Sequence, residues 1–179
     1  MKHQSIARRC AAVTATAALA LGGSALLAPG TAQAAMVKAK KGSISATVPF
    51  DCVIFDSPFT YDAQIKLTGT RAPKAKAVVL KATMSDFPGV SPVAIDNDVE
   101  VKLSLKLGSK AVVLKGKGHA TAAAGEGVPV PPVKGSITST SNSFVAAATK
   151  MEFTIPDYAL TITCTPAEGQ GAMGTLKLK

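Results

Sequence analysis

Alternation of apolar and polar residues is the dominant pattern of the chain after its first 34 residues. In the strongest run, Val99, Val101, Leu103, Leu105 and Leu107 are separated by charged or polar residues. A period of two is typical of a β-strand that buries one face, so residues 99–107 are predicted to form such a strand.

The same reasoning predicts further strands at 44–54, 61–68, 77–82, 111–120, 151–155, 158–165 and 175–179. Segment 135–148, rich in Ser, Thr and Ala, fits either a strand or a loop. Turn residues separate these runs, and no helix is expected among them. The pattern predicts an all-β protein, an immunoglobulin-like antiparallel β-sandwich of roughly eight or nine strands. The likeness is one of architecture, because Trp is absent and Ile162 stands where a tyrosine corner would require Tyr.

Three local expectations concern the connections. Asp56–Pro58 should form a turn. Val128–Val133 has three prolines in six residues and should be stiff and extended, serving as a crossover between sheets or as a ligand for a proline-recognising groove. The terminal strand 175–179 is expected to lie beside the strand that carries Cys164.

The first 34 residues have the features of a signal peptide. Lys2, Arg8 and Arg9 precede an apolar stretch at 11–27, and Ala32–Ala34 has the small-x-small form of a cleavage site. The apolar stretch is short for a transmembrane span. We expect a cleavable signal helix at 1–34, export by the general secretory or the twin-arginine route, and one mature domain at 35–179 without a transmembrane segment.

Cysteine usage supports one covalent link. Cys10 belongs to the leader, which leaves Cys52 and Cys164 in the mature part. Two cysteines in an exported chain are typical of a disulfide, so a Cys52–Cys164 bond is predicted.

Charge excludes one class of partner. The chain has a formal net charge of +9, which becomes +6 without the leader, and Arg71 is the one arginine among 17 mature basic residues. Specific nucleic-acid recognition relies on the planar fork of arginine, so nucleic acid is not expected as a partner. Lysine-rich faces protect strand edges or attract anionic polymers of the cell envelope.

No catalytic constellation is recognisable. Gly169–Gly174 matches G-x-G-x-x-G, but too few residues follow it for the helix that dinucleotide binding needs. His119 is the one mature histidine, and no G-x-S-x-G nucleophile motif exists. One histidine and two oxidised cysteines are too few for a zinc site. We therefore predict a protein that is not an enzyme and needs no cofactor.

Two groups of residues are candidates for binding. Asp96, Asp98 and Glu100 would share one strand face and could offer oxygens to Ca²⁺, although a solvated turn explains them as well. Aromatic residues near turns form a candidate surface-binding patch, unless they close the ends of the sandwich: Phe55, Phe59, Tyr61 and Phe87.

Several short motifs resemble those of a family of secreted β-sandwich domains of unknown function from actinobacteria. They are Val48–Cys52, the proline-rich Val128–Val133, Thr163–Pro166 and the closing Gly174–Leu178. The resemblance implies an extracellular or cell-surface β-sandwich with paired cysteines, and it implies no activity.

Three functions are compatible with these observations. The first is a structural or interaction module of the cell envelope that contacts another surface protein. The second is a module that binds carbohydrate or wall polymer through lysines and loop aromatics. The third is a protease inhibitor that presents a rigid loop such as Val128–Val133.

Overall fold

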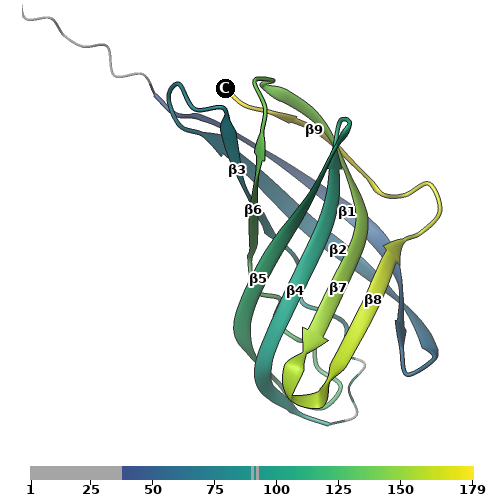
Figure 1. Ribbon diagram of the computed structural model, residues 1–179. Coiled ribbons are helices and arrows are strands. Elements are labelled where there is room, and N and C mark those ends of the chain that lie inside the picture. Colours follow the sequence, from purple (N-terminus) through teal and green to yellow (C-terminus); the bar gives the residue numbers. More distant parts are fainter. Residues whose placement is uncertain (1–37, 90, 92) are drawn as a thin grey trace, which may run out of the picture. The chain divides into compact units, whose positions relative to one another are not determined.

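The protein is described by a computed structural model at residues 38–89, 91 and 93–179 (Figure 1). The predicted signal peptide, 1–34, lies outside these residues. Nine strands follow one another along the chain: β1 (Lys40–Ile54), β2 (Ser57–Arg71), β3 (Ala77–Thr83), β4 (Ile95–Leu107), β5 (Lys110–Ala122), β6 (Val133–Thr138), β7 (Ser143–Ile155), β8 (Leu160–Pro166) and β9 (Ala172–Lys177). A 3₁₀ turn, η1 (Pro156–Tyr158), separates β7 from β8.

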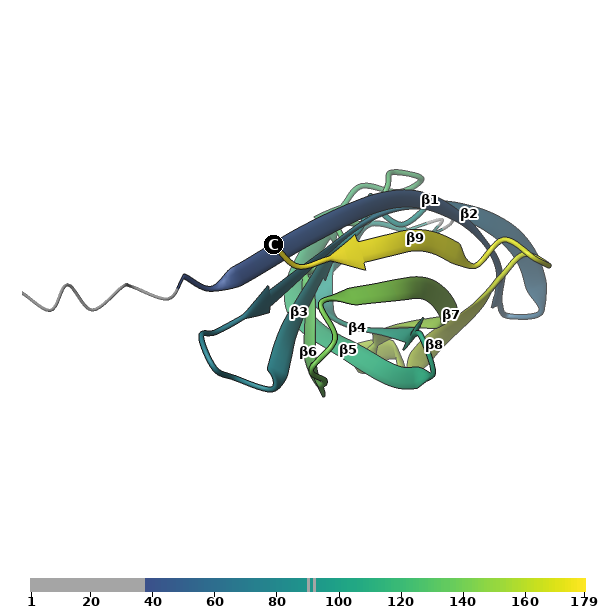
Figure 2. The same ribbon diagram turned by 90° about the horizontal axis from the view of Figure 1, so that it is seen from above.

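All strand pairings are antiparallel, and they join the strands into one sheet in the order β4-β5-β6-β3-β2-β1-β8-β7-β9. An additional pairing between β4 and β7 closes the sheet on itself. Seen from above, β1, β2 and β9 form one layer and β4, β5, β7 and β8 form the opposite layer, with β3 and β6 between them along one side (Figure 2). The predicted all-β antiparallel sandwich is confirmed, and its two layers belong to one continuous sheet.

The core is made by the apolar half of each alternating strand. The burial pattern of β4 shows this, since Val99, Val101 and Leu103 have no exposed surface while Lys102 between them is exposed. A strand points successive side chains to opposite faces, so the pattern of the sequence becomes the inside and the outside of the closed sheet. Among the described residues, there is no helix of the length and apolar character that crossing a membrane requires.

The predicted disulfide is formed. Cys52 of β1 and Cys164 of β8 are direct register partners with Cα atoms 4.1 Å apart, and both side chains are fully buried. The β1–β8 pairing extends only over residues 50–53 of β1. It ends next to Pro49, where the amide hydrogen needed for a further ladder bond is missing. The covalent bond therefore secures the shortest of the junctions along the β2-β1-β8-β7 side.

The turn between β1 and β2 differs from the expected one. Ile54 pairs with Ser57, so the turn consists of Phe55 and Asp56, and Pro58 already belongs to β2. Both turn residues have positive φ, 47° and 63°, which a two-residue turn of type I′ requires. The right-handed twist of the two strands favours this type of turn, so both turn residues adopt a positive φ although neither is glycine.

The terminal strand has a different neighbour from the one expected. β9 pairs with the first half of β7, residues 143–147, whereas β8 pairs with the second half, residues 151–155. The loop after β8 contains Gly169 with φ 73°, and it carries the chain past β8 to the free half of β7. At its end Lys179 exchanges two backbone hydrogen bonds with Lys41, which ties the C-terminus to β1.

The proline-rich segment connects β5 to β6 along the surface of β5. A Cβ atom on Gly116 would lie 2.5 Å from the carbonyl oxygen of Pro132, and one on Gly118 would lie 3.0 Å from the Cβ of Pro131. The two glycines therefore allow the prolines to approach the strand closely. Val128 and Val133 at the ends of the segment are buried. This placement fits a stiff connection, and segment 135–148, left open by its composition, supplies β6 and the start of β7.

Candidate functional site

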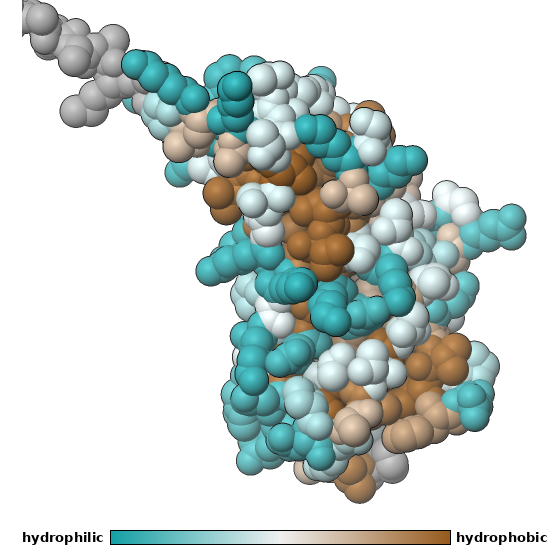
Figure 3. All heavy atoms as spheres, in the orientation of Figure 1, coloured by the Kyte–Doolittle hydropathy of each residue, from teal (hydrophilic) through white to brown (hydrophobic). Residues whose placement is uncertain are grey.

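An apolar pocket of about 640 Å³ lies at the end of the molecule where the β1–β2 turn, the connection from β3 to β4 and the β7–β8 turn come together. In Figure 3 apolar surface gathers on this lower end of the molecule. Its inner wall is formed by buried residues of five different segments, namely Phe87, Ile95, Val128, Phe153, Ile155 and Ile162. Its rim is formed by Ile54, Phe55, Pro58, Val93, Tyr158 and Leu160.

Phe87 is the centre of the inner wall. Its ring is stacked on Phe153 at a centroid distance of 4.9 Å, and its edge contacts Phe59 at 5.6 Å and Tyr61 at 5.1 Å. Such aromatic pairs stabilise a cluster beyond the area that they bury. The cluster joins β2, β7 and the connection after β3, so it holds the inner wall, which is the floor of the pocket, in one arrangement.

The segment that carries Phe87 is fixed at its backbone as well. Phe87 and Val128 exchange two hydrogen bonds of 2.8 Å as an isolated bridge between two loops. The hydroxyl of Tyr61 donates to the carbonyl oxygen of Ser85 at 2.6 Å, and burial raises the pKa of this hydroxyl. The loop is thereby attached to β2 on one side and to the proline-rich connection on the other, which preforms this wall of the pocket.

The rim, in contrast, exposes large apolar side chains. Phe55 is 79% exposed and Tyr158 is 57% exposed. The chain has few aromatic residues, and these two contribute little to its core. Phe55 also has the left-handed φ that bulky residues rarely adopt. An exposed aromatic ring in a strained conformation stabilises neither the core nor the turn, and such positions cluster at ligand-contacting sites.

The four aromatic residues predicted as a surface patch take different positions. Phe55 and Phe59 line the pocket at its rim and side, and Phe87 lines its floor. Tyr61 is 2% exposed and packs behind Phe87 without lining the pocket. Three of the four thus line one concave site, whereas Tyr61 is buried behind it.

Sequence reasoning missed the residues that complete the site, above all Phe153 and Tyr158. Alternation in the predicted strand 151–155 points Phe153 toward the core, where it packs, but Phe153 also lines the pocket. The signal for Tyr158 was available, because it follows Pro156-Asp157 and an apolar aromatic residue in a turn is unusual.

The described lining of the pocket carries few polar groups. Among the described lining residues, Tyr158 carries the one ionisable side chain, and its hydroxyl oxygen accepts a hydrogen bond of 3.1 Å from Asn97. The hydroxyl of Ser91 donates to the carbonyl oxygen of Val93 at 2.7 Å. Such a lining provides neither a base beside a nucleophile nor a set of donors for a developing charge.

The acidic residues considered for Ca²⁺ lie on the outer face of β4, opposite cations of β5. Asp96 Oδ1 is 2.8 Å from His119 Nε2, and Asp98 is 3.4 Å from His119 Nδ1 and 3.3 Å from Lys117 Nζ. Within the described part of the chain, no group of three or more His, Cys, Asp or Glu side chains is arranged to hold a metal ion.

These surface pairs shift the protonation of their members. The hydrogen bonds to Asp96 and then Asp98 raise the pKa of His119 above its usual value. The bond from His119 lowers the pKa of Asp96, and the bond from Lys117 lowers that of Asp98. The side chains of these residues are 49–75% exposed, so the arrangement is a cross-strand network of ion pairs on the surface.

Comparison of the chain with protein-family models, with curated proteins and with solved structures finds no match.

Proposed function

We propose that this chain is an exported, non-catalytic interaction module that holds an apolar group of its ligand in the pocket between Phe55 and Tyr158. The observation that carries the proposal is the pocket itself. Its volume of about 640 Å³ lies within the range of about 300–1,000 Å³ that is usual for small-molecule sites, and its lining is mostly apolar.

The division between a fixed floor and an exposed rim supports binding. Burial of apolar surface drives association, and a floor that is already ordered loses little conformational freedom when a ligand enters. Phe55, Val93 and Tyr158 are each more than half exposed and would be covered by the ligand. An acyl or other aliphatic chain fits this lining, because the lining has few polar groups that would need hydrogen-bond partners from the ligand.

Export is supported by the sequence of the leader and by the buried disulfide, since such bonds persist in oxidising compartments. The inhibitor alternative gains no support from Val128–Val133, because this segment lies along β5 rather than projecting from the molecule.

The proposal can be tested with the uncharged apolar fluorophore N-phenyl-1-naphthylamine. The variant Leu160→Trp places a larger side chain at the pocket rim, and Val145→Trp places the same side chain at an exposed site on β7 that does not line the pocket. We expect the wild type and Val145→Trp to bind the fluorophore alike, and Leu160→Trp to bind it at least tenfold more weakly. Equal binding by all three proteins would refute the proposed site.

A second variant separates binding from stability. Phe55→Gly removes the exposed ring and relieves a left-handed conformation that costs about 1–2 kcal/mol for a residue with a side chain. Glycine costs about 0.5–1 kcal/mol in lost conformational entropy, and little buried surface is lost with a ring that is 79% exposed. We therefore expect an unfolding free energy equal to that of wild type or up to about 1.5 kcal/mol higher, together with weaker fluorophore binding. Unchanged binding would show that Phe55 takes no part in the site.

A further inference from the structure

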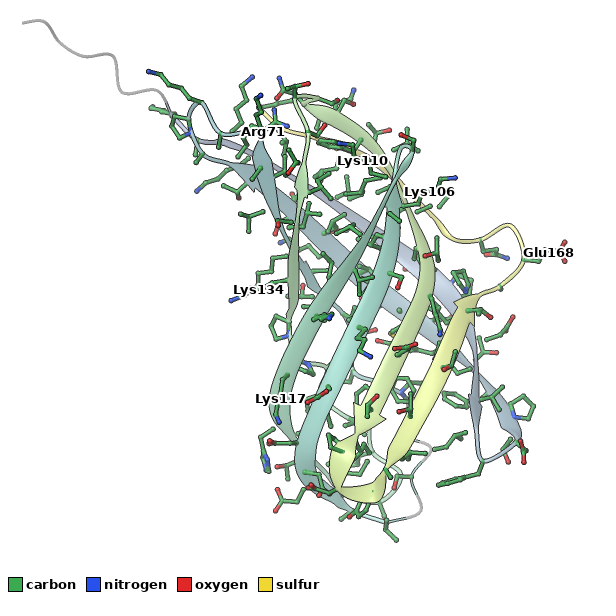
Figure 4. All side chains as sticks on the ribbon, in the orientation of Figure 1. Arg71, Lys106, Lys110, Lys117, Lys134 and Glu168 are labelled. Carbon is green, nitrogen blue, oxygen red and sulfur yellow. A yellow bond between two sulfur atoms is a disulfide. The ribbon has the colours of Figure 1, made fainter. Side chains whose placement is uncertain are left out.

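A row of four lysines crosses the outer face of the sheet at right angles to the strands. Lys81 of β3 pairs with Lys134 of β6, Lys134 pairs with Lys115 of β5, and Lys115 pairs with Lys102 of β4. All four side chains are exposed. Since neighbouring strands lie about 4.8 Å apart, the lysine row is about 14 Å long at the backbone. Figure 4 shows Lys134 projecting outward from β6.

Acidic residues leave most of this row uncompensated. Glu152 of β7 pairs with Lys102 at 3.2 Å and marks one end of the row, and it also accepts from Lys150 at 2.7 Å. Across the described residues, no ion pair reaches Lys81, Lys115 or Lys134. Lys117, two positions beyond the row on β5, is by contrast paired with Asp98 and Glu100.

The arrangement is unfavourable for the fold alone. Like charges at directly opposed positions destabilise a sheet, and this sheet has three such contacts in succession. Opposite charges do face each other elsewhere on the same face of the sheet, as in the Asp98–Lys117 pair. An anionic partner would offset the repulsion within this row of cations.

The shape of the row indicates the form of that partner. The positions next to it on one side are neutral, since Val79 pairs with Ser136 and Val113 pairs with Ser104. On the other side the nearest lysine is neutralised by the two acids described above, so the uncompensated charge next to the row follows its line, which suits a linear partner better than a lipid surface. Lysine ammonium groups act as point charges and suit phosphate groups without demanding a fixed orientation.

We propose that Lys81, Lys134, Lys115 and Lys102 form a binding site for a linear polyanion whose charges are phosphate groups, lying across the strands. The site is separate from the apolar pocket and goes beyond the function proposed above. Binding occurs by neutralisation of the polymer charges and release of their counterions, so affinity falls steeply with salt.

The test uses long-chain inorganic polyphosphate as the probe and titrates its binding at several salt concentrations. The row variant changes Lys81, Lys115 and Lys134 to Gln. A matched control variant changes Lys40, Lys76 and Lys177 to Gln, which are exposed lysines outside the row, so both proteins lose the same charge. We expect at least a tenfold loss of affinity for the row variant and less than a threefold loss for the control. The slope of log affinity against log salt should fall by about 2 for the row variant, at about 0.7 per cation.

Three outcomes would overturn the proposal. Wild-type protein that fails to bind polyphosphate would do so, as would an equal loss in the two variants, which would mean that net charge alone acts. Binding to phosphatidylglycerol vesicles without binding to polyphosphate would assign the face to a membrane instead. Thermal unfolding provides the check on folding: removal of the repulsion should leave the row variant at least as stable as wild type.

Discussion

The disulfide offers the sharpest test of how the fold is held together. Cys52 and Cys164 are separated by 112 residues in the sequence, and they link β1 to β8 across a pairing of four residues. Reduction of the bond leaves the sequence and the core side chains unchanged. The comparison of oxidised with reduced wild-type protein therefore isolates the effect of the covalent link.

The expected magnitude follows from the length of the closed loop. In the chain-entropy model, a link across about 112 residues restricts the unfolded chain by about 4.8 kcal/mol at 25 °C. Since about 1.4 kcal/mol changes an equilibrium tenfold, the unfolding equilibrium constant should rise by about three thousandfold on reduction. That loss is a large part of a typical domain stability of about 5–15 kcal/mol.

Chemical denaturation of both forms, monitored by circular dichroism, measures this difference. Because the effect acts on the unfolded chain, the reduced protein should also show a steeper dependence on denaturant. The double variant Cys52→Ala/Cys164→Ala should unfold at a still lower denaturant concentration, since it also removes two buried sulfur atoms. Unfolding free energies of the oxidised and reduced forms that agree within about 1 kcal/mol would refute the reasoning.

The link also has a functional consequence, because Ile54 and Ile162 of the pocket lie two residues from the two half-cystines. Reduction leaves four register pairs to hold β1 against β8. Faster hydrogen exchange in β8 and weaker fluorophore binding are therefore expected in the reduced protein while it is still folded.

Two further predictions concern single side chains. The guanidinium of Arg71 donates to the carbonyl oxygens of residues 139–141 and, at 2.7 Å, to the side chain of Asn142. Lysine has one nitrogen for these four acceptors, so Arg71→Lys should lower the unfolding free energy by about 2 kcal/mol. A decrease below about 0.5 kcal/mol, measured by chemical denaturation, would contradict this prediction. The pKa of His119, measured by NMR and assigned with His119→Gln, should exceed about 6.5, because two carboxylates of β4 stabilise its charged form. Its stabilising contribution is then fully present below about pH 6.5 and is lost as the pH rises through the raised pKa, whereas the contribution of the two carboxylates is lost as the pH falls through their lowered values. An NMR pKa at or below 6.5 would show that the ion pairs do not form in solution.

Local patterns were sufficient to predict the class of the fold. Alternation in segments such as 99–107 determines which face of a strand is apolar, because side chains point to opposite faces whatever the strand pairs with. The count of cysteines was sufficient to predict the disulfide once Cys10 was assigned to the leader, since the two that remain allow one pairing. Both inferences need only neighbouring residues or a simple count.

Tertiary structure decided everything that depends on which strands meet and in which register. The sequence contains no local signal that β4 closes the sheet against β7, or that β9 joins β7 rather than β8. The pocket and the lysine row are consequences of that pairing, because they assemble residues from segments up to about one hundred positions apart. A shift of one residue between two strands would reverse the faces of their side chains and dissolve both sites, so the register of distant strands, and not the composition of any one of them, determines what this surface can bind.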